Sequence, residues 1–186
     1  MLEEHYIKTG KVYFVYRDLP LSIHPGARPA SAFANCAADQ GAFWPMHDRL
    51  YVGAEAQEWG SGDAADQQVF LKYAQELNLD IAALKSCVAQ KARANDQIEA
   101  DVKEAHGRYI ENTPTFLLNG QKVSGAYSYS TWQQLIDERL GQDNQPTHGG
   151  AAGNWMILLA IGALAVILGG GAALVWTAII RRSRGT

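Results

Sequence analysis

Cysteine is scarce in this sequence, and its two copies are far apart. Only 2 of the 186 residues are cysteine, Cys36 and Cys87, and no Cys-x-x-Cys pair occurs. Disulfide exchange needs a thiolate of lowered pKa, usually at the start of a helix, and a second thiol that resolves the mixed disulfide. Cys36 lies among alanines inside a predicted helix and Cys87 lies near the end of another, so we predict no catalytic cysteine in these residues.

Motifs for other kinds of chemistry are absent as well. The sequence has no glycine-rich phosphate loop and no nucleophile elbow. His24, His47 and His106 are scattered and lack the spacing of a zinc site, so we predict no metal and no cofactor. Acidic residues number 19 against 16 basic ones, and several of the basic ones stand at the C-terminal end, which argues against a nucleic-acid partner.

The start of the sequence does not resemble an export signal. Residues 1–5, MLEEH, carry acid where a signal peptide carries base, and no apolar run follows them. A domain outside the cytoplasm needs such a signal. We therefore expect either that the true start lies upstream of Met1 or that the domain is cytoplasmic.

A long uncharged run lies near the C-terminus. Residues 155–180 read WMILLAIGALAVILGGGAALVWTAII. As a helix this run would measure about 39 Å, more than the roughly 30 Å hydrocarbon core of a bilayer. A buried core helix is rarely so long and need not be apolar all round. The run therefore predicts one transmembrane helix, and the membrane is its expected partner.

The residues at the two ends of this run predict its orientation. Trp155 and Trp176 lie near the ends, where indole rings favour the headgroup region. Arg181, Arg182 and Arg184 follow directly, and by the positive-inside rule they place the C-terminus in the cytoplasm. The N-terminal domain would then lie outside the cytoplasm.

Two further features surround the predicted span. Ala165, Gly169 and Ala173 form a small-xxx-small ladder that could admit a second transmembrane helix, although small residues are common in membrane helices in any case. Residues 141–154 are polar and rich in glycine. They predict a flexible tether between the domain and the span.

The remaining residues predict a mixed domain of helices and strands. KVYFVY at 11–16 is dense in β-branched and aromatic residues and predicts a strand buried on both faces. Helical spacing of apolar residues dominates from 30 to 107. Two short strands, 115–118 and 122–124, are joined by Asn-Gly, the strongest short signal for a hairpin. Ser130 opens a predicted capping box before the last helix of the domain.

Several separate blocks of the sequence, in order, resemble one known family. They are VYRDLPL at 15–21, IHP at 23–25, NCAADQGAFWPMHD at 35–48, NTPTF at 112–116 and NGQKVSGA at 119–126. These blocks are similar to the DsbA family of extracytoplasmic thiol-disulfide oxidoreductases, which have a thioredoxin fold with a helical insertion. The resemblance covers about residues 2–140. Family members carry a strand and a Cys-x-x-Cys pair ahead of a segment like residues 2–10, and this sequence lacks both.

The resemblance implies a substrate-binding loop at Thr113, Pro114 and Thr115. In the family the equivalent proline follows a cis peptide bond, and the opened backbone lets an extended substrate pair beside it. Thr113 would then lie next to the reactive sulfurs of a complete enzyme. Taken alone, a Thr-Pro step could equally well begin a strand, which is a favoured place for proline.

The resemblance also bears on the two cysteines, because several DsbA-like proteins have a second, structural pair. We expect a structural disulfide between Cys36 and Cys87 that clamps the helical insertion. The alternatives are a redox-active pair and two buried free thiols.

We therefore expect an α/β thioredoxin-like fold of the DsbA type, N-terminally incomplete, with one C-terminal transmembrane helix. Its expected parts are the domain at 1–140, the linker at 141–154, the transmembrane helix at 155–180 and a basic cytoplasmic tail at 181–186. The first expected function is a membrane-anchored extracytoplasmic thiol-disulfide oxidoreductase that is inactive in exchange without its cysteine pair. Protein or peptide thiols would be the substrates of a longer form with that pair. The alternative is a redox-dead binding module or a structural subunit of a membrane complex.

Overall fold

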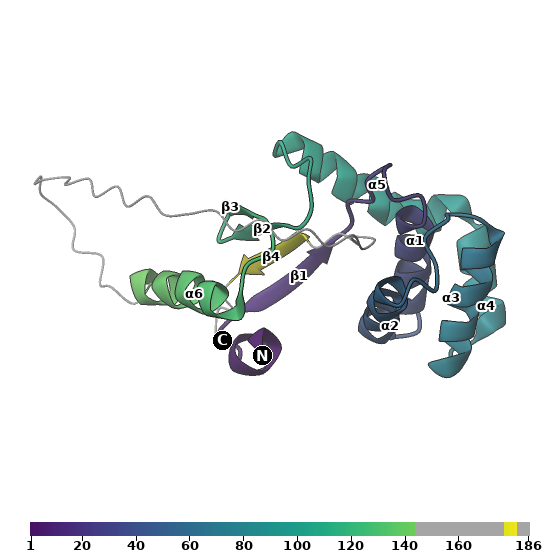
Figure 1. Ribbon diagram of the computed structural model, residues 1–186, viewed down its shortest axis with the longest axis horizontal. Coiled ribbons are helices and arrows are strands. Elements are labelled where there is room, and N and C mark those ends of the chain that lie inside the picture. The colour runs from purple at the N-terminus through teal and green to yellow at the C-terminus, as the bar shows by residue number, and fades with distance from the viewer. Residues whose placement is uncertain (144–176, 182–186) are drawn as a thin grey trace, which may run out of the picture.

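The computed structural model describes residues 1–143 and 177–181, which form a sheet with flanking helices and a separate block of helices (Figure 1). The elements in chain order are η1 (Glu3–Ile7), β1 (Tyr13–Arg17), α1 (Ala27–Ala38), α2 (Phe43–Glu55), α3 (Ala64–Glu76), α4 (Ile81–Ala89), α5 (Lys91–Gly107), β2 (Thr115–Leu118), β3 (Gln121–Ser124), α6 (Tyr129–Asp143) and β4 (Thr177–Arg181). Helices α1 to α5 make up the helical block, while η1 and α6 lie beside the sheet (Figure 1).

The sheet has four strands in the order β1-β4-β2-β3. β2 and β3 form the predicted hairpin, and both residues of its turn, Asn119 and Gly120, have positive φ (51° and 87°), as a tight two-residue turn requires. β1 is less buried than its sequence predicts. Because it lies at the edge of the sheet, part of its surface faces solvent, and Tyr13 is 59% exposed.

The prediction that the C-terminal apolar run is helical through Ile180 is wrong for its last residues. Thr177–Ile180 were expected in the final turn of a transmembrane helix and Arg181 in a cytoplasmic tail. Instead these residues form a strand that pairs antiparallel with β1 and parallel with β2. Threonine and isoleucine favour strands, and two facing strand edges offer hydrogen bonds to both sides of an inserted segment.

Among residues 1–143 and 177–181, no helix is both long enough and apolar enough to cross a membrane. The rest of the predicted span, from 155 to 176, lies outside the described residues, and so does most of the predicted tether. The predicted anchors and helix-packing residues that also lie outside them are Trp155, Ala165, Gly169, Ala173, Trp176, Arg182 and Arg184.

The helical block has its own apolar core. Phe33 of α1, Met46 of α2 and Phe70 of α3 are among its buried side chains. Asp63 starts α3 by accepting hydrogen bonds from the N–H groups of the first turn, and Asp80 starts α4 in the same way. Such caps satisfy backbone donors that have no partner within the helix.

A disulfide ties α1 to α4 inside this block. The Sγ atoms of Cys36 and Cys87 are 2.04 Å apart and their Cα atoms 5.8 Å. Cys36 is 1% exposed. The predicted disulfide is confirmed, and because the sequence has only 2 cysteines, neither is left as a free thiol in this structure.

α6 begins earlier than its predicted capping box. Ser128, and not Ser130, caps the helix, because the Thr131 N–H donates to the Ser128 hydroxyl at 3.2 Å. Ile136 on the inner side of α6 packs with Tyr6 and Leu118 in a second small core. The Tyr6 hydroxyl also donates to Asp137 at 2.8 Å, so α6 holds the N-terminal turn in place.

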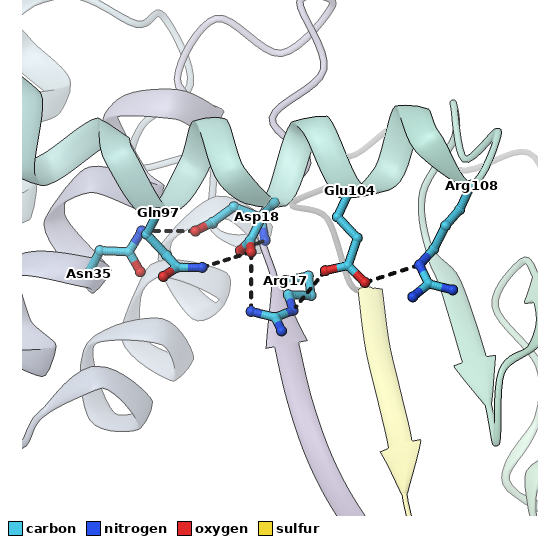
Figure 2. Close-up of polar contacts among 7 residues, drawn as sticks. Arg17, Asp18, Asn35, Gln97, Glu104 and Arg108 are labelled. Atoms are coloured by element: carbon cyan, nitrogen blue, oxygen red, sulfur yellow. Dashed lines mark hydrogen bonds and ion pairs between the residues drawn. The ribbon is translucent and has the colours of Figure 1, made fainter.

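A buried polar cluster joins the sheet to the helical block where β1 ends (Figure 2). The Asp18 N–H donates to Asp101 Oδ2 at 2.9 Å, and Arg17 Nη1 lies 3.2 Å from Asp101 Oδ1. Asn35 of α1 donates to Asp18 Oδ2 at 2.8 Å. Gln97 donates to Asp101 Oδ1 at 2.7 Å from one turn earlier in α5. These contacts hold β1, α1 and α5 against one another.

Burial dominates the electrostatics of this cluster. Asp18 and Asp101 are 2% and 4% exposed. Burial raises the pKa of Asp18, although Ser31 and Asn35 favour its charged form. Burial likewise raises the pKa of Asp101 against the opposing effects of the Asp18 N–H and the Arg17 guanidinium. Both carboxylates therefore cost stability when they are charged.

Reduction of the disulfide is expected to lower the free energy of unfolding by about 4 kcal/mol, because the bond closes a long loop in the unfolded chain. Urea unfolding with and without reductant measures this difference. The double variant Cys36→Ser/Cys87→Ser should match the reduced protein and should not respond to reductant. Equal midpoints for the oxidised and reduced protein would contradict a structural role.

The variant Asp18→Asn is expected to change how stability depends on pH. A carboxyl whose pKa is raised in the folded state binds more protons folded than unfolded, so the wild type loses stability as pH rises above the ordinary pKa of aspartate. The asparagine variant lacks this loss. Between pH 4 and pH 7 it should therefore gain stability relative to the wild type.

Urea unfolding across that pH range tests the expectation. Asp96→Asn serves as the matched control, because Asp96 is an exposed carboxylate on the same helix, α5. A difference between wild type and Asp18→Asn that stays constant with pH would mean that the buried charge does not set this dependence.

Candidate functional site

The loop between α5 and β2 is anchored on its C-terminal side. The Thr113–Pro114 peptide bond is cis. The Pro114 carbonyl accepts a hydrogen bond from the Gly125 N–H at 2.8 Å. Thr115 is fully buried, and its hydroxyl lies 2.8 Å from the Asn112 carbonyl and 3.0 Å from the Asn112 side-chain oxygen. These contacts fix the loop to the hairpin that follows it.

The other side of the loop is open. Thr113 and Pro114 are partly exposed. Within the described residues, the N–H and the carbonyl of Thr113 have no backbone hydrogen-bond partner. A residue just before a strand, whose backbone groups lack partners and whose neighbour is anchored, can pair with an extended peptide. The geometry therefore offers a place for main-chain recognition at Thr113.

The start of the loop has an exposed apolar side chain. Tyr109 is 83% exposed and adopts a left-handed backbone conformation (φ 55°). The Lys122 ammonium donates to the Tyr109 carbonyl at 2.9 Å, which ties this turn to β3. Tyrosine combines a large apolar ring with a polar tip, and such side chains are common where proteins contact other chains.

The polar cluster at the end of β1 also fixes the turn of α5 from which the loop departs. Figure 2 shows Gln97, Glu104 and Arg108 projecting from α5 toward the strands. Glu104 lies 3.0 Å from Arg108 Nε and 3.7 Å from Arg17 Nε. Arg17, Glu104 and Arg108 line a small pocket with Ile110 and Leu117. Positive and negative side chains alternate in this series of contacts, so their charges offset one another. The contacts hold α5 in position.

The structure does not bring the predicted site residues together. Thr113, Pro114 and Thr115 lie in the loop before β2, in the sheet part of the molecule. Cys36 and Cys87 join α1 to α4 in the helical block (Figure 1). Among residues 1–143 and 177–181, no group of three or more histidine, cysteine, aspartate or glutamate side chains could hold a metal ion.

Sequence reasoning missed the polar cluster, although signals for it exist. Arg17 and Asp18 directly follow the apolar segment of the predicted first strand. Asp101 comes three residues after Ile98 and four before Ala105, both buried, and residues at this spacing share one face of a helix. A carboxylate on the apolar face of a helix needs a partner, and that partner is the end of β1.

Comparison with known proteins gives one family and several partial relatives. A family model described as thioredoxin matches residues 1–138. The chain is 34% identical over 161 residues to a protein named Na(+)/H(+) antiporter NhaA 3 from Salinispora tropica, covering 82% of this chain and 23% of the relative. It is 37% identical over 118 residues to Na(+)/H(+) antiporter NhaA 1 from Salinispora arenicola, covering 63% of this chain and 17% of the relative.

A third relative has the same pattern. The Na(+)/H(+) antiporter NhaA of Herminiimonas arsenicoxydans is 30% identical over 124 residues, which cover 67% of this chain and 18% of the relative. The chain thus spans less than a quarter of the length of these relatives. No solved structure matches it. The match to the family model covers most of the described residues, and the chain belongs to the thioredoxin family.

Proposed function

We propose that residues 1–143 are the polypeptide-binding part of a DsbA-like thiol-disulfide oxidoreductase domain. The observation that supports this best is the loop at Thr113 and Pro114, which leaves the backbone of Thr113 open beside an anchored strand. An extended substrate segment would pair with Thr113 through main-chain hydrogen bonds. The blocks VYRDLPL at 15–21 and NTPTF at 112–116 support the DsbA-like assignment within the thioredoxin family.

Within these residues the domain binds substrate and does not exchange disulfides. Both cysteines are consumed in the disulfide of the helical block, and exchange requires an accessible thiolate. A cysteine pair for electron transfer would have to come from a segment outside this sequence. The proposed substrates are extended, cysteine-containing segments of other proteins.

We place the domain on the outer side of a cell membrane, with residues 155–176 as a single-pass anchor. The disulfide supports an oxidising compartment. As a helix, residues 155–176 would measure about 33 Å, which still matches the roughly 30 Å core of a bilayer without the residues of β4. Arg182 and Arg184 would mark the cytoplasmic end, and the ladder of small residues would permit a helix partner.

The names of the relatives support a second candidate function. The three relatives are named as Na(+)/H(+) antiporters, and this chain corresponds to less than a quarter of each. The alternative is therefore a redox-inactive binding module that belongs to a membrane transport protein or complex. Both candidate functions use the proposed peptide-binding loop. They differ in whether a cysteine pair from another segment carries out electron transfer beside that loop.

The purified chain is expected to give no catalysis of disulfide exchange, because no thiol is available at the loop. Insulin reduction by dithiothreitol should proceed at the uncatalysed rate in its presence. The double variant Cys36→Ser/Cys87→Ser should give the same rate as the wild type. Turnover that depends on Cys36 and Cys87 would refute the assignment of these cysteines to a purely structural role.

An extended peptide with a blocked cysteine is expected to bind at the loop through its backbone. Replacing a single peptide N–H by N-methyl should weaken binding by about tenfold, which corresponds to the loss of a main-chain hydrogen bond of about 1.4 kcal/mol. Thr113→Ala should bind nearly as well as the wild type, because main-chain recognition does not need the threonine side chain.

Titration by fluorescence anisotropy and by amide chemical shifts of the protein measures both effects. The largest shift changes should fall at residues 113–115. Lys85→Ala, in α4 on the helical block, serves as a control that leaves binding unchanged. Equal affinity for the methylated and unmethylated peptides, or shift changes confined to the helical block, would argue against this site.

A further inference from the structure

We infer that the space between β1 and β2 is a strand-acceptor site and that β4 is an exchangeable occupant of it. β1 and β2 do not pair with each other, because β4 lies between them. β4 pairs with β1 from Tyr13↔Arg181 to Arg17↔Thr177 and with β2 at Leu117↔Ile179 and Leu118↔Ile180. The backbone hydrogen bonds that link β1 to β2 within the sheet therefore all pass through one short segment, β4.

The two strands that flank β4 form a suitable site for an extended apolar peptide. Each presents backbone N–H and C=O groups toward the space that β4 fills, and such edges pair with added strands. Leu117 and Leu118 of β2 are 5% and 1% exposed and belong to two different apolar cores. β2 is thus also held by side-chain packing in these two cores, besides its pairing with β4.

Occupation by β4 and a single crossing of the membrane exclude each other in one molecule. This step rests on the proposed span at 155–176. α6 ends at Asp143 and β4 begins at Thr177, and both belong to the same domain. A single crossing between them would put Thr177 on the opposite side of the bilayer from the sheet. When the chain is anchored in this way, β4 must leave and the acceptor site must open.

Exchange is governed by effective concentration. β4 belongs to the same chain as the acceptor site, and a connection of this length gives an effective concentration on the order of 1 mM. A peptide from another protein cannot compete at micromolar concentration while β4 is free to return. The same peptide binds once β4 is withdrawn or disrupted.

The sequence of β4 defines the class of ligand. Thr177-Ala178-Ile179-Ile180 is uncharged and rich in β-branched residues, and only Arg181 carries charge. The proposed ligand is an extended, uncharged, β-branched segment of another polypeptide. This site differs from the loop at Thr113, which recognises backbone at the start of β2 and not between two strands.

Cross-linking in the full chain tests occupancy by β4. Val15→Cys/Ile179→Cys places thiols on paired residues of β1 and β4, and Phe116→Cys/Val123→Cys does the same for β2 and β3 as the matched control. Paired residues on antiparallel strands lie within reach of a short bifunctional methanethiosulfonate. In aqueous buffer both pairs should cross-link. No linkage of the Val15/Ile179 pair, while the control pair links, would overturn the inference.

The same variants in sealed phosphatidylcholine vesicles test the exclusion. A C-terminal tag that resists external protease identifies molecules that cross the bilayer once. In these molecules the Val15/Ile179 linkage should fall at least tenfold while the control pair is unchanged. Full linkage in protected molecules would overturn the exclusion. A tag that is never protected would overturn the proposed span, and the strand-acceptor site would then be decided by peptide binding.

Peptide binding tests the acceptor site without a membrane. Ile179→Pro removes one backbone N–H from β4 and weakens its pairing with β1 and β2. A fluorescent peptide with the sequence of residues 177–181 should therefore bind this variant at least tenfold more tightly than the unchanged chain. A peptide of the same composition with its central residue N-methylated serves as the control. Equal binding to the variant and the unchanged chain, or no binding to either, would overturn the site.

Discussion

The pairing of β4 with both β1 and β2 is the constraint on which the rest of the sheet depends. A strand in the interior of a sheet satisfies the backbone groups of two neighbours at once, and its loss exposes two edges. β2 lies between β4 and β3, and the loop at Thr113 leads directly into it. The position of that loop relative to β1 and the helical block therefore depends on which segment fills the centre of the sheet.

The second constraint is the buried polar cluster at Asp18 and Asp101. Two buried carboxylates cost stability, and the Asn35 amide, the Asp18 N–H and the Arg17 guanidinium offset that cost. The same contacts fix α5, and α5 delivers the chain to the candidate binding loop. The cluster thus couples the helical block to the site, although none of its side chains takes part in the loop itself.

The arrangement separates stabilisation from recognition. The disulfide lies in the helical block, where it joins α1 to α4, and the loop proposed to bind peptide leads into β2 of the sheet. Under the proposed function the loop at Thr113 supplies recognition, and both cysteines are held in the disulfide, so neither is a free thiol for electron transfer. That combination is consistent with both proposed functions, since either requires contact with an extended polypeptide near a membrane.

Features that depend on neighbouring residues could be predicted from the sequence. Asn119-Gly120 specifies the hairpin turn by its tolerance of positive φ. The disulfide was expected from the family resemblance and not from spacing, since a separation of 51 residues says nothing about proximity in space. The capping serine was misplaced by two positions, because only geometry reveals that the Ser128 hydroxyl reaches the Thr131 N–H.

The sequence by itself determined the element types between residues 11 and 140, the hairpin, the candidate loop at 113–115 and the apolar character of the C-terminal run. Tertiary structure alone decided the contacts between distant segments. Residues 177–181 have the composition of a strand and also suit the end of an apolar helix, and the facing edges of β1 and β2 made them a strand. Asp101 became a structural residue only because the end of β1 lies against α5. Both outcomes depend on partners far away in the chain, and a local pattern that shows the need for a partner does not identify which distant segment supplies it.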